Sequence, residues 1–353
     1  MKTRVLMIGP ALTVKGGMSS VAIAIIENLS ADFEVTFLPT YAEGGKLKAG
    51  WAFLAAVARA RGLARSHDLA HIHFSKKGST FRKAVVARII KSTGTPLLLH
   101  SHSSSYGFFD SLPGFLKSVV SAYLASADRF IALSESWAKH YTGKGANPNR
   151  VVVLPNPVVI PKSVDNREGR DTVTFIFMGA MGDRKGAFDL AEAFVEVGRL
   201  RPNARLIMAG NGEVDRVRNI LKEGGVYEQC EIYDWVGPEE RDRLLRQADA
   251  FILPSYNEGL PMAMLEAIGY ELAPIVTPVG GIPEVIESGR NGLLVEPGDK
   301  EAIASAMLRL TDDGAERVAM GAAARRTAED YDIEKYIAEM ENIYRDLASN
   351  KVS

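Results

Sequence analysis

The feature that most constrains the fold is an alternation along the chain, in which short apolar runs are separated by longer amphipathic stretches. Strands that alternate with helices form βαβ units and parallel sheets. Strands are expected at Val5–Ile8, Ala70–Phe74, Leu97–His100, Phe130–Leu133, Val151–Leu154, Phe175–Met178, Arg205–Ala209, Glu231–Trp235, Ala250–Leu253 and Pro274–Thr277. The sequence therefore predicts an α/β protein.

Two parts of the chain begin alike, and 353 residues are too many for one ordinary core. Val5–Gly9 and Phe175–Gly179 are both apolar strands that run into glycine. Three prolines in Pro155–Pro161, followed by polar residues through Arg170, are typical of an interdomain linker. We expect two doubly wound parallel-sheet domains, residues 1–160 and 161–330, that face a cleft. Ligands of such sheets bind beyond the carboxyl ends of the strands, so a small-molecule site is expected in that cleft.

The charge of the chain is unevenly distributed. Residues 1–160 contain 19 Lys and Arg, 8 Asp and Glu and all six histidines, although the whole chain has a net charge of −1. Such asymmetry indicates domains with different partners, although the basic helices can also be simple solvated faces. No aromatic RNA-binding motif or recognition-helix pattern accompanies the basic residues, so no nucleic acid is expected as a partner.

Two basic stretches of the first part also contain apolar side chains. Basic residues mixed with Trp, Phe and Leu suit a helix that lies on anionic lipid, and they would also hold a lipid diphosphate. The residues are Lys46, Lys48, Trp51, Phe53, Leu54, Arg59, Arg61 and Arg65 in one stretch and Lys76, Lys77, Arg82, Lys83, Arg88 and Lys91 in the other.

Cysteine content and hydropathy indicate the cellular compartment in which the protein is expected. Cys230 is the single cysteine, which excludes a disulfide within the chain and favours a reducing compartment. The N-terminal apolar run is too short for a signal peptide, and no window approaches the roughly 18–20 apolar residues of a membrane span. We expect a cytoplasmic protein.

Several polar residues of the first part follow predicted strands. Gly16 and Gly17 precede an apolar helix expected at Val21–Leu29, so their backbone amides can approach a phosphate closely, although a plain turn explains them equally well. His100 and His102 alternate at the end of a strand and point to one side of it. Two histidines can indicate zinc, but Asp, Glu and Cys are absent nearby, so we expect no metal and favour His102 as a substrate contact.

His71 and His73 end another predicted strand. They too can face the ligand edge of the sheet, but a core or supporting position is the expectation for both.

Two cations follow the first strand of the second part. Arg184 and Lys185 precede a helix expected at Ala187–Leu200, where positive charge is unfavourable for the helix dipole. A bound diphosphate would reverse this cost, since Arg offers forked hydrogen bonds and Lys a point charge. The alternative is that both side chains are simply solvated.

The segment that is richest in candidate residues runs from Ala250 to Gly269. A buried strand leads to a loop that contains Glu258, and Pro261 suits the first position of the helix that follows. Glu266 lies within this apolar helix, where a carboxylate needs a partner. Carboxylates accept hydrogen bonds from ribose or sugar hydroxyls, although a buried ion pair with a neighbouring arginine would also satisfy Glu266.

The spacing Glu258-(seven residues)-Glu266, with Gly-Leu-Pro after the first glutamate, resembles the EX7E signature of retaining GT-B glycosyltransferases of glycosyltransferase family 4. Other segments agree in their order: Gly16-Gly17, Val153-Leu-Pro-Asn-Pro157, Arg184-Lys-Gly186, Ala209-Gly-Asn-Gly-Glu213, Val276-Thr-Pro-Val-Gly-Gly-Ile-Pro-Glu284 and Asn291-Gly-Leu-Leu-Val295. The resemblance covers nearly the whole chain and implies the GT-B fold, with two Rossmann-like domains and a C-terminal helix, residues 331–353, that crosses back to the first domain.

The resemblance also implies a role for each candidate residue. Arg184 and Lys185 would hold the donor diphosphate in place of a metal ion, Glu266 the ribose and Glu258 the donor sugar. Gly17 would lend its amide to a phosphate, and His102 would lie beside the reacting sugar. The expected catalytic residues are His102, Glu258, Arg184 and Lys185, and the expected donor-binding residues are Gly16, Gly17, Gly182, Arg184, Lys185, Asn211, Val236, Glu258, Gly259, Leu260, Pro261 and Glu266.

The implied reaction is transfer of a sugar, with retention, from a UDP- or GDP-sugar, without a cofactor or a metal. Asp330-Tyr-Asp332 has the letters of a metal-binding Asp-x-Asp motif but lies far past the last predicted strand. The segment His71–Lys83 resembles bacterial enzymes that build capsule, exopolysaccharide or O-antigen on a lipid carrier, which implies a lipid-linked saccharide acceptor and a peripheral position on the inner face of the cell membrane.

The alternatives are a nucleotide-sugar epimerase of GT-B fold, a nucleotide-dependent oxidoreductase and a non-catalytic sugar-nucleotide or lipid-binding protein. The absence of a GxGxxG motif after the first strand disfavours the oxidoreductase.

Overall fold

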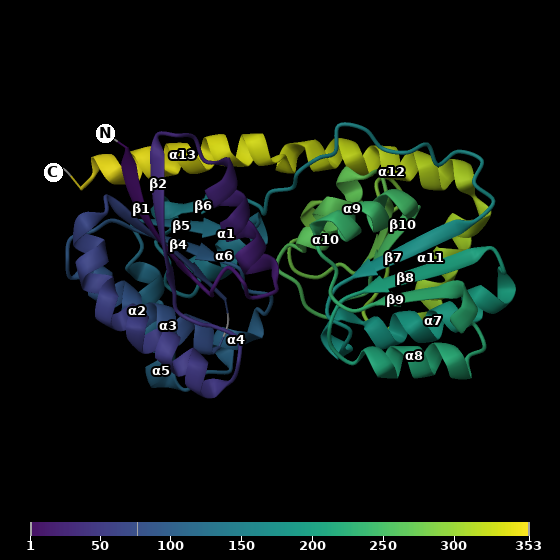
Figure 1. Cartoon of the computed structure of the whole chain (residues 1–353), viewed down its shortest axis with the longest axis horizontal. Coiled ribbons are helices and arrows are strands. Elements are labelled where there is room, and N and C mark those ends of the chain that lie inside the picture. Colours follow the sequence, from purple (N-terminus) through teal and green to yellow (C-terminus); the bar gives the residue numbers. More distant parts are fainter. Residues whose placement is uncertain (1, 76, 352–353) are drawn as a thin grey trace. The chain divides into compact units, whose positions relative to one another are not determined.

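A computed structural model describes residues 2–75 and 77–351 and divides into two compact units (Figure 1). Unit 1 comprises residues 1–157 and 333–353, and unit 2 comprises residues 158–332. Lys76, one of the basic residues named above, lies outside the described residues.

Unit 1 is built on a parallel sheet of six strands in the order β2-β1-β3-β4-β5-β6. Its elements are β1 (Thr3–Gly9), α1 (Gly17–Asn28), β2 (Phe33–Pro39), α2 (Lys46–Ser66), β3 (Leu69–Phe74), α3 (Gly78–Lys91), β4 (Leu97–Ser101), α4 (Gly107–Asp110), α5 (Gly114–Ala125), β5 (Arg129–Ala132), α6 (Glu135–Thr142), η1 (Pro148–Arg150), β6 (Val151–Val153) and α13 (Ile333–Ser349). The direction of strand addition reverses between β1 and β3, which is where a doubly wound sheet opens a crevice for ligands.

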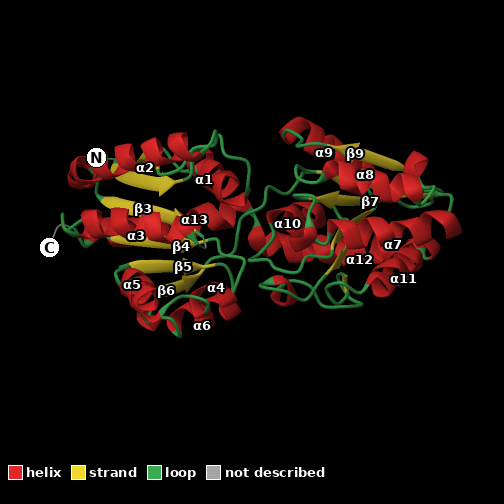
Figure 2. Cartoon of the chain, turned by 90° about the horizontal axis from the view of Figure 1, so that it is seen from below, coloured by secondary structure: helices red, strands yellow, loops and turns green. Residues whose placement is uncertain are grey.

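Helices cover both faces of this sheet (Figure 2). On one face, α2 approaches closely because Ala56, Ala60 and Ala64, spaced four apart along one side of the helix, are all fully buried. On the other face, α13 runs beside α1, β1 and β3. It buries Tyr336, Met340, Tyr344 and Leu347, so the C-terminal helix completes the core of the N-terminal unit.

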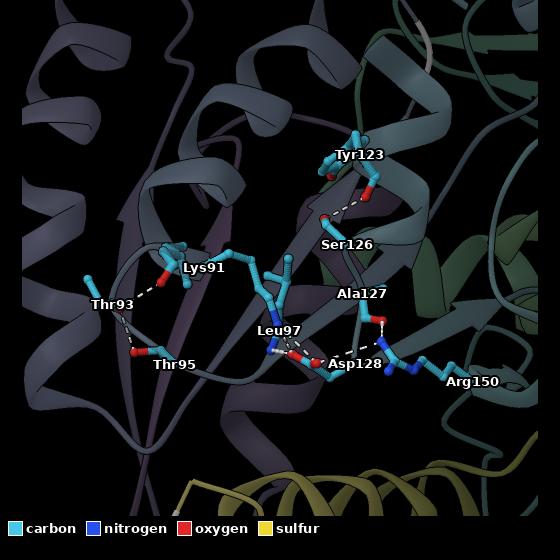
Figure 3. Close-up of polar contacts among 10 residues, drawn as sticks. Lys91, Thr93, Thr95, Leu97, Tyr123, Ser126, Ala127, Asp128 and Arg150 are labelled. Atoms are coloured by element: carbon cyan, nitrogen blue, oxygen red, sulfur yellow. Dashed lines mark hydrogen bonds and ion pairs between the residues drawn. The ribbon is translucent and has the colours of Figure 1, made fainter. Parts of the chain in front are cut away.

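A polar cluster fixes the amino-terminal end of the unit 1 sheet (Figure 3). Asp128, just before β5, accepts hydrogen bonds from the backbone N–H of Leu97 at 2.7 Å and from Lys91 Nζ at 2.7 Å. Arg150 donates to the carbonyl of Ala127 at 3.0 Å. These bonds join α3, β4, β5 and the start of β6 at that end of the sheet. Ligands of doubly wound sheets bind at the opposite end, beyond the carboxyl ends of the strands.

Unit 2 contains a second parallel sheet of six strands, in the order β12-β11-β10-β7-β8-β9. Its elements are β7 (Val173–Met178), η2 (Asp183–Lys185), α7 (Ala187–Leu200), β8 (Ala204–Ala209), α8 (Val214–Glu223), η3 (Tyr227–Gln229), β9 (Cys230–Tyr233), α9 (Pro238–Gln247), β10 (Ala250–Leu253), α10 (Met262–Gly269), β11 (Ala273–Val276), η4 (Ile282–Glu284), β12 (Leu293–Leu294), α11 (Lys300–Asp312), α12 (Gly314–Ala328) and η5 (Glu329–Tyr331). This is the Rossmann strand order, and its direction reverses between β7 and β10.

The structure departs from the sequence-based expectations at several boundaries. Strands β2 and β12 were not predicted, and β9 ends at Tyr233, so that Trp235 and Val236 lie in a loop. The chain passes into unit 2 at residue 158 rather than 161, because the N–H of Val158 donates to the carbonyl of Tyr331 at 2.8 Å. None of the described helices is both long enough and apolar enough to cross a bilayer.

Candidate functional site

Two loops meet at the carboxyl ends of β7 and β10, the reversal point of the unit 2 sheet. The N–H of Tyr256 donates to the carbonyl of Arg184 at 2.9 Å, and Arg184 NH1 donates to the carbonyl of Asn257 at 3.1 Å. The loop after β7 and the loop after β10, which the sequence singled out separately, therefore form one surface.

Glycines allow these loops to approach so closely. Gly186 has a positive φ of 66°, and a Cβ there would lie 2.0 Å from the carbonyl oxygen of Pro254. Gly280, with a φ of 62°, would place a Cβ 2.1 Å from the carbonyl oxygen of Glu258. A side chain at either position would both strain the backbone and push the Glu258 loop away.

Glu258 lies at the centre of this surface and is only 6% exposed. Its Oε1 accepts hydrogen bonds from Lys185 Nζ at 2.5 Å and from Ser255 Oγ at 2.8 Å. Arg184 NH1 lies 3.8 Å from the same oxygen, with 43% of the arginine side chain exposed. One carboxylate thus fixes two cations, and the exposed guanidinium remains open to an added anion such as a phosphate.

Glu266, on α10, is largely buried and faces Arg241 of α9, whose NH1 lies 3.2 Å from Oε1. The ion pair that the sequence left as an alternative is therefore present. Burial raises the pKa of Glu266, and Arg241 opposes this shift. The Arg241 side chain is 40% exposed, whereas that of Glu266 is 17% exposed.

Pro261 is the N-cap residue of α10 rather than its first residue, because its φ and ψ of −74° and 119° are extended. Its carbonyl accepts from the N–H of Met264 at 3.1 Å, so the helix begins at Met262. Gly259 and Leu260 lie in the loop between Glu258 and this helix, and Gly259 accepts from the N–H of Gly281 at 2.7 Å.

The remaining residues predicted for unit 2, Gly182, Asn211 and Val236, lie in the segments that follow β7, β8 and β9. Gly182 is the N-cap of η2. The carbonyl of Asn211, after β8, accepts from the N–H of Met181 at 2.6 Å, which ties the β8 loop to the β7 loop. Val236 is partly buried in the loop between β9 and α9. Their donor-binding roles remain predictions.

Sequence reasoning missed Ser255 and Arg241 as partners of the two glutamates. Ser255 lies in the predicted loop, and its polar type next to Glu258 was the available signal. Arg241 is one of several arginines in a charged helix, and nothing in the sequence distinguishes it from the others.

A hollow of about 340 Å³ opens beside Arg184. It is lined by Asp183, Arg184, Phe188, Asp189, Glu192, Arg216, Tyr256 and Lys300. Its carboxylates already have partners, since Tyr256 donates to Asp189 at 3.0 Å and Lys300 pairs with Glu192. The lining carries three carboxylates and three cations, so the hollow as a whole has no excess of positive charge.

In unit 1, Gly16 and Gly17 form the start of α1 at the carboxyl end of β1. Gly16 has a φ of 151°, and its carbonyl accepts from the N–H of Ser19 at 3.1 Å. No side chain caps this helix end, so its first amides suit an anion.

Four histidines form a stacked cluster at the ends of β3 and β4. His71, His73 and His100 are fully buried, whereas His102 is partly exposed and is the more accessible of the two candidates in β4 and its loop. His73 Nδ1 lies 3.0 Å from His102 Nε2, and His71 Nε2 lies 3.3 Å from His100 Nδ1.

Burial lowers the pKa of all four imidazoles, which favours their neutral form. Burial, with a smaller contribution from Lys83, lowers the pKa of His102 to about 3, and burial likewise lowers the pKa of His71 to about 3. His71, His73 and His100 also present ring nitrogens within 4.8 Å of one another, a spacing that a metal ion could use.

Comparison with known proteins identifies the class of enzyme. A model of the glycosyl transferase 4-like domain matches residues 27–157, and a model of glycosyl transferases group 1 matches residues 161–327. The two matches follow one another in the order of the two units. The chain therefore belongs to the family 4 type of glycosyltransferases, and its fold is GT-B.

The names of similar proteins agree with this assignment. A protein of Escherichia coli, UDP-Gal:alpha-D-GlcNAc-diphosphoundecaprenol alpha-1,3-galactosyltransferase, is 25% identical over 317 residues, 81% of this chain and 77% of its own length. The putative teichuronic acid biosynthesis glycosyltransferase TuaC of Bacillus subtilis is 26% identical over 69% of this chain and 61% of its own length. The crystal structure of Anabaena HepE in complex with UDP and glucose superposes with a TM-score of 0.77, covering 97% of this chain and 99% of that one, at 16% identity.

Proposed function

We propose that the protein is a retaining, metal-independent glycosyltransferase that moves a sugar from a UDP- or GDP-sugar to a lipid-linked saccharide in the synthesis of a bacterial surface polysaccharide. The observation that carries this proposal is the contact of Glu258 with both Lys185 and Arg184 at the reversal point of the unit 2 sheet. That arrangement joins an acceptor for sugar hydroxyls to two donors for a diphosphate.

The proposed reaction replaces one bond to the anomeric carbon of the donor by another on the same face. The acceptor hydroxyl oxygen bonds to this carbon while the bond from the carbon to the phosphate oxygen breaks. The acceptor proton passes to an oxygen of the departing nucleoside diphosphate. Lys185 and Arg184 stabilise the charge that develops on that diphosphate, the role a metal ion has in other glycosyltransferases.

Each of the other predicted residues also has a proposed role. Glu266 accepts hydrogen bonds from the ribose hydroxyls, and Glu258 accepts them from the donor sugar. Gly17 offers its amide to a phosphate, and neutral His102 accepts a hydrogen bond from the reacting sugar. No resident cofactor takes part.

The proposed acceptor follows from unit 1 and from the Escherichia coli relative, whose name specifies a sugar on diphosphoundecaprenol. One face of α2 exposes Leu47, Trp51 and Leu54 by 84%, 72% and 58%, at positions i, i+4 and i+7. Exposed Lys46, Lys48, Arg59, Arg61 and Arg65 flank them. Such a face suits binding to anionic lipid, which supports the proposal that the enzyme works at the inner surface of the cell membrane, near a lipid-linked substrate.

The deciding experiment incubates the full chain with a panel of UDP- and GDP-sugars, first alone and then with lipid-linked saccharides, in the presence of EDTA. A glycosyltransferase yields a new glycosidic bond only when acceptor is present, and NMR of the anomeric proton shows whether configuration is retained. An epimerase converts the donor without acceptor, and a binding protein changes neither compound. An inverted product, or activity abolished by EDTA, overturns the retaining, metal-independent assignment.

A further inference from the structure

Lys83 of α3 is a buried cation without a counter-charge. Its side chain is 1% exposed, and its one hydrogen bond within the described chain is a long contact of 3.5 Å from Nζ to Ser79 Oγ. No described carboxylate forms an ion pair with Lys83 or with its neighbour Arg82. A buried charge is costly unless it is paired, so this arrangement needs an explanation.

The surroundings of Lys83 all favour negative charge. Arg82 is cationic, and its Nε is buried without a partner in the described structure. The amino-terminal end of α3 begins at Gly78, has no acidic residue in its first turn and has no side-chain cap. Burial, together with Arg82, lowers the pKa of Lys83 to about 7.

The Lys83 side chain also lies toward the carboxyl end of β3. Side chains of a helix lean toward its amino terminus, so the lysine points toward Ser79 and the carboxyl end of β3. The N–H of Ser75, which follows β3, donates to Ser79 Oγ at 3.3 Å. Lys83 lowers the pKa of both His73 and His102, which places its charge near the two histidines.

The same surroundings argue against a metal ion on His71, His73 and His100. Their ring nitrogens have a suitable spacing, and the Nε2 atoms of His73 and His100 are buried without a partner. However, a divalent cation there would lie near Lys83, and no carboxylate is among the groups that shift the pKa of these histidines. The net positive field favours an anion at this end of β3 and β4.

We propose that Lys83, together with Arg82 and the start of α3, forms a phosphate-binding subsite of unit 1 that takes the phosphoryl group of the acceptor. The identity of the ligand as an acceptor rests on the proposed function, whereas the anion site itself does not. The phosphate would neutralise Lys83 and accept hydrogen bonds from Nζ, from the arginine and from the hydroxyls of Ser75 and Ser79.

A small hollow of about 20 Å³ with a mixed polar and apolar lining lies next to this subsite. Ser75 and Thr80 line its polar side, and Phe74, Phe108 and Leu124 are among its apolar residues. This volume is too small for an isoprenyl chain, so the expectation that the phosphate belongs to an isoprenyl lipid comes from the lipid-linked acceptor of the proposed function. The shared chemistry is a phosphate monoester or diphosphate, and experiment must separate the two sources.

Calorimetry on the full chain saturated with UDP tests the subsite, because UDP occupies the diphosphate site predicted in unit 2. The probes are farnesyl diphosphate, inorganic pyrophosphate and farnesol, at concentrations below micelle formation. We expect binding of farnesyl diphosphate and weaker binding of pyrophosphate, with no binding of farnesol. Binding of pyrophosphate and farnesyl diphosphate with equal affinity would overturn the isoprenyl assignment, and binding of neither would overturn the subsite.

Variants identify the residue responsible. Lys83→Met should weaken farnesyl diphosphate binding at least tenfold and, without ligand, raise the Tm, because it removes an uncompensated buried charge. Arg88→Met changes the same charge at an exposed position of α3 and should alter neither property. Lys83→Gln serves if the methionine variant is poorly folded. Unchanged affinity in a folded Lys83 variant, or stabilisation by Zn²⁺ instead of by the phosphates, would contradict the proposal.

The test separates the two proposals. If UDP does not bind but the phosphates still require Lys83, the subsite stands and the proposed function fails. If UDP binds and supports transfer but Lys83→Met has an unchanged KM for the lipid-linked acceptor, the subsite fails alone.

Discussion

At the scale of single residues, the contact between Lys185 and Glu258 has two consequences that can be measured separately. The two side chains are 13% and 6% exposed, so each neutralises a charge that water reaches poorly. A diphosphate bound nearby would share the lysine with the carboxylate. The same ammonium would therefore contribute to stability in the free protein and to affinity in a diphosphate complex.

Lys185→Ala should weaken binding of UDP or GDP about 10- to 100-fold, because a hydrogen bond from a charged group contributes about 1.5–3 kcal/mol. It should lower the free energy of unfolding by about 1–3 kcal/mol, since Glu258 loses its nearest cation but keeps Ser255. Isothermal titration and chemical denaturation measure the two effects. Arg290→Ala removes an exposed cation of the same unit and serves as the control. Unchanged nucleotide affinity in Lys185→Ala would refute its assignment as a diphosphate ligand.

The raised pKa of Glu266 predicts how the affinity for nucleoside diphosphates depends on pH. Burial raises its pKa above the ordinary value of 4.5, so it takes up a proton at a higher pH than a solvated glutamate. A protonated carboxyl loses acceptor capacity, so nucleoside diphosphate affinity should fall as the pH is lowered from 7 toward 5. Glu266→Gln should bind weakly at every pH and should lack this additional fall.

Lowering the pH should affect the stability of the fold in the opposite direction from nucleotide affinity, as far as Glu266 is concerned. Because the folded-state pKa is raised, ionised Glu266 costs stability at pH values above it, and the stabilising contribution is present only at lower pH. Glu266→Gln should therefore unfold at the same or a higher temperature than the wild type at pH 7. A lower Tm would show that the ion pair with Arg241 outweighs the cost of burial.

At the scale of secondary-structure elements, α2 has two faces of different chemistry. Its alanine face packs on the sheet, and its outer face exposes Leu47, Trp51 and Leu54 among basic residues. The paired variant Trp51→Ser, Leu54→Ser should reduce cosedimentation with liposomes that contain anionic lipid, while leaving the fold unchanged. Leu200→Ser, at a side chain 51% exposed in unit 2, is the matched control. Equal pelleting of all three proteins would exclude α2 as the membrane-binding face.

The elements also show how far the sequence could be interpreted. Ten of the twelve strands follow short apolar runs, and the GT-B fold is confirmed. Most of the expected strands follow continuous apolar runs, so β2 was missed: Phe33–Pro39 is only partly buried and alternates apolar with polar residues, a pattern that is also typical of half-buried strands. Strand β12 has two residues and no detectable pattern.

Contacts between segments that are far apart in the chain could not be predicted from the sequence. The loops that carry Lys185 and Glu258 were both recognised, but their direct contact depends on which strands are neighbours in the sheet. The bond between His71 Nδ1 and Tyr344 Oη, at 2.7 Å, joins residues 273 positions apart. The buried position of Lys83 was equally hidden, since basic residues in that stretch suggested a solvated or lipid-facing surface.

At the scale of the whole molecule, the C-terminal helix belongs to the unit that contains the N-terminus. Helix α13 buries four large side chains in unit 1, at about 1.5–3 kcal/mol each, which together approach the whole stability of an ordinary domain. A chain ending at Asp332 should therefore lose the calorimetric unfolding transition of unit 1 and retain that of unit 2.

Limited proteolysis provides the second measurement on the truncated chain, with cleavage expected in residues 2–157 and protection expected in unit 2. Tyr344→Phe removes only the bond to His71 and should lower the stability of unit 1 by about 1 kcal/mol. Two unaltered transitions in the truncated chain would show that α13 is dispensable for the fold of unit 1.

The return of α13 to β1 and β3 also sets an order of events on the ribosome. The first 157 residues emerge without the helix that covers one face of their sheet, and all of unit 2 is synthesised before that helix appears. At about 5–20 residues per second, the uncovered face waits roughly 10–35 s, during which unit 2 can fold first. The half of the protein that is made first is thus the last to be finished, and one apolar face of its sheet stays uncovered in the interval.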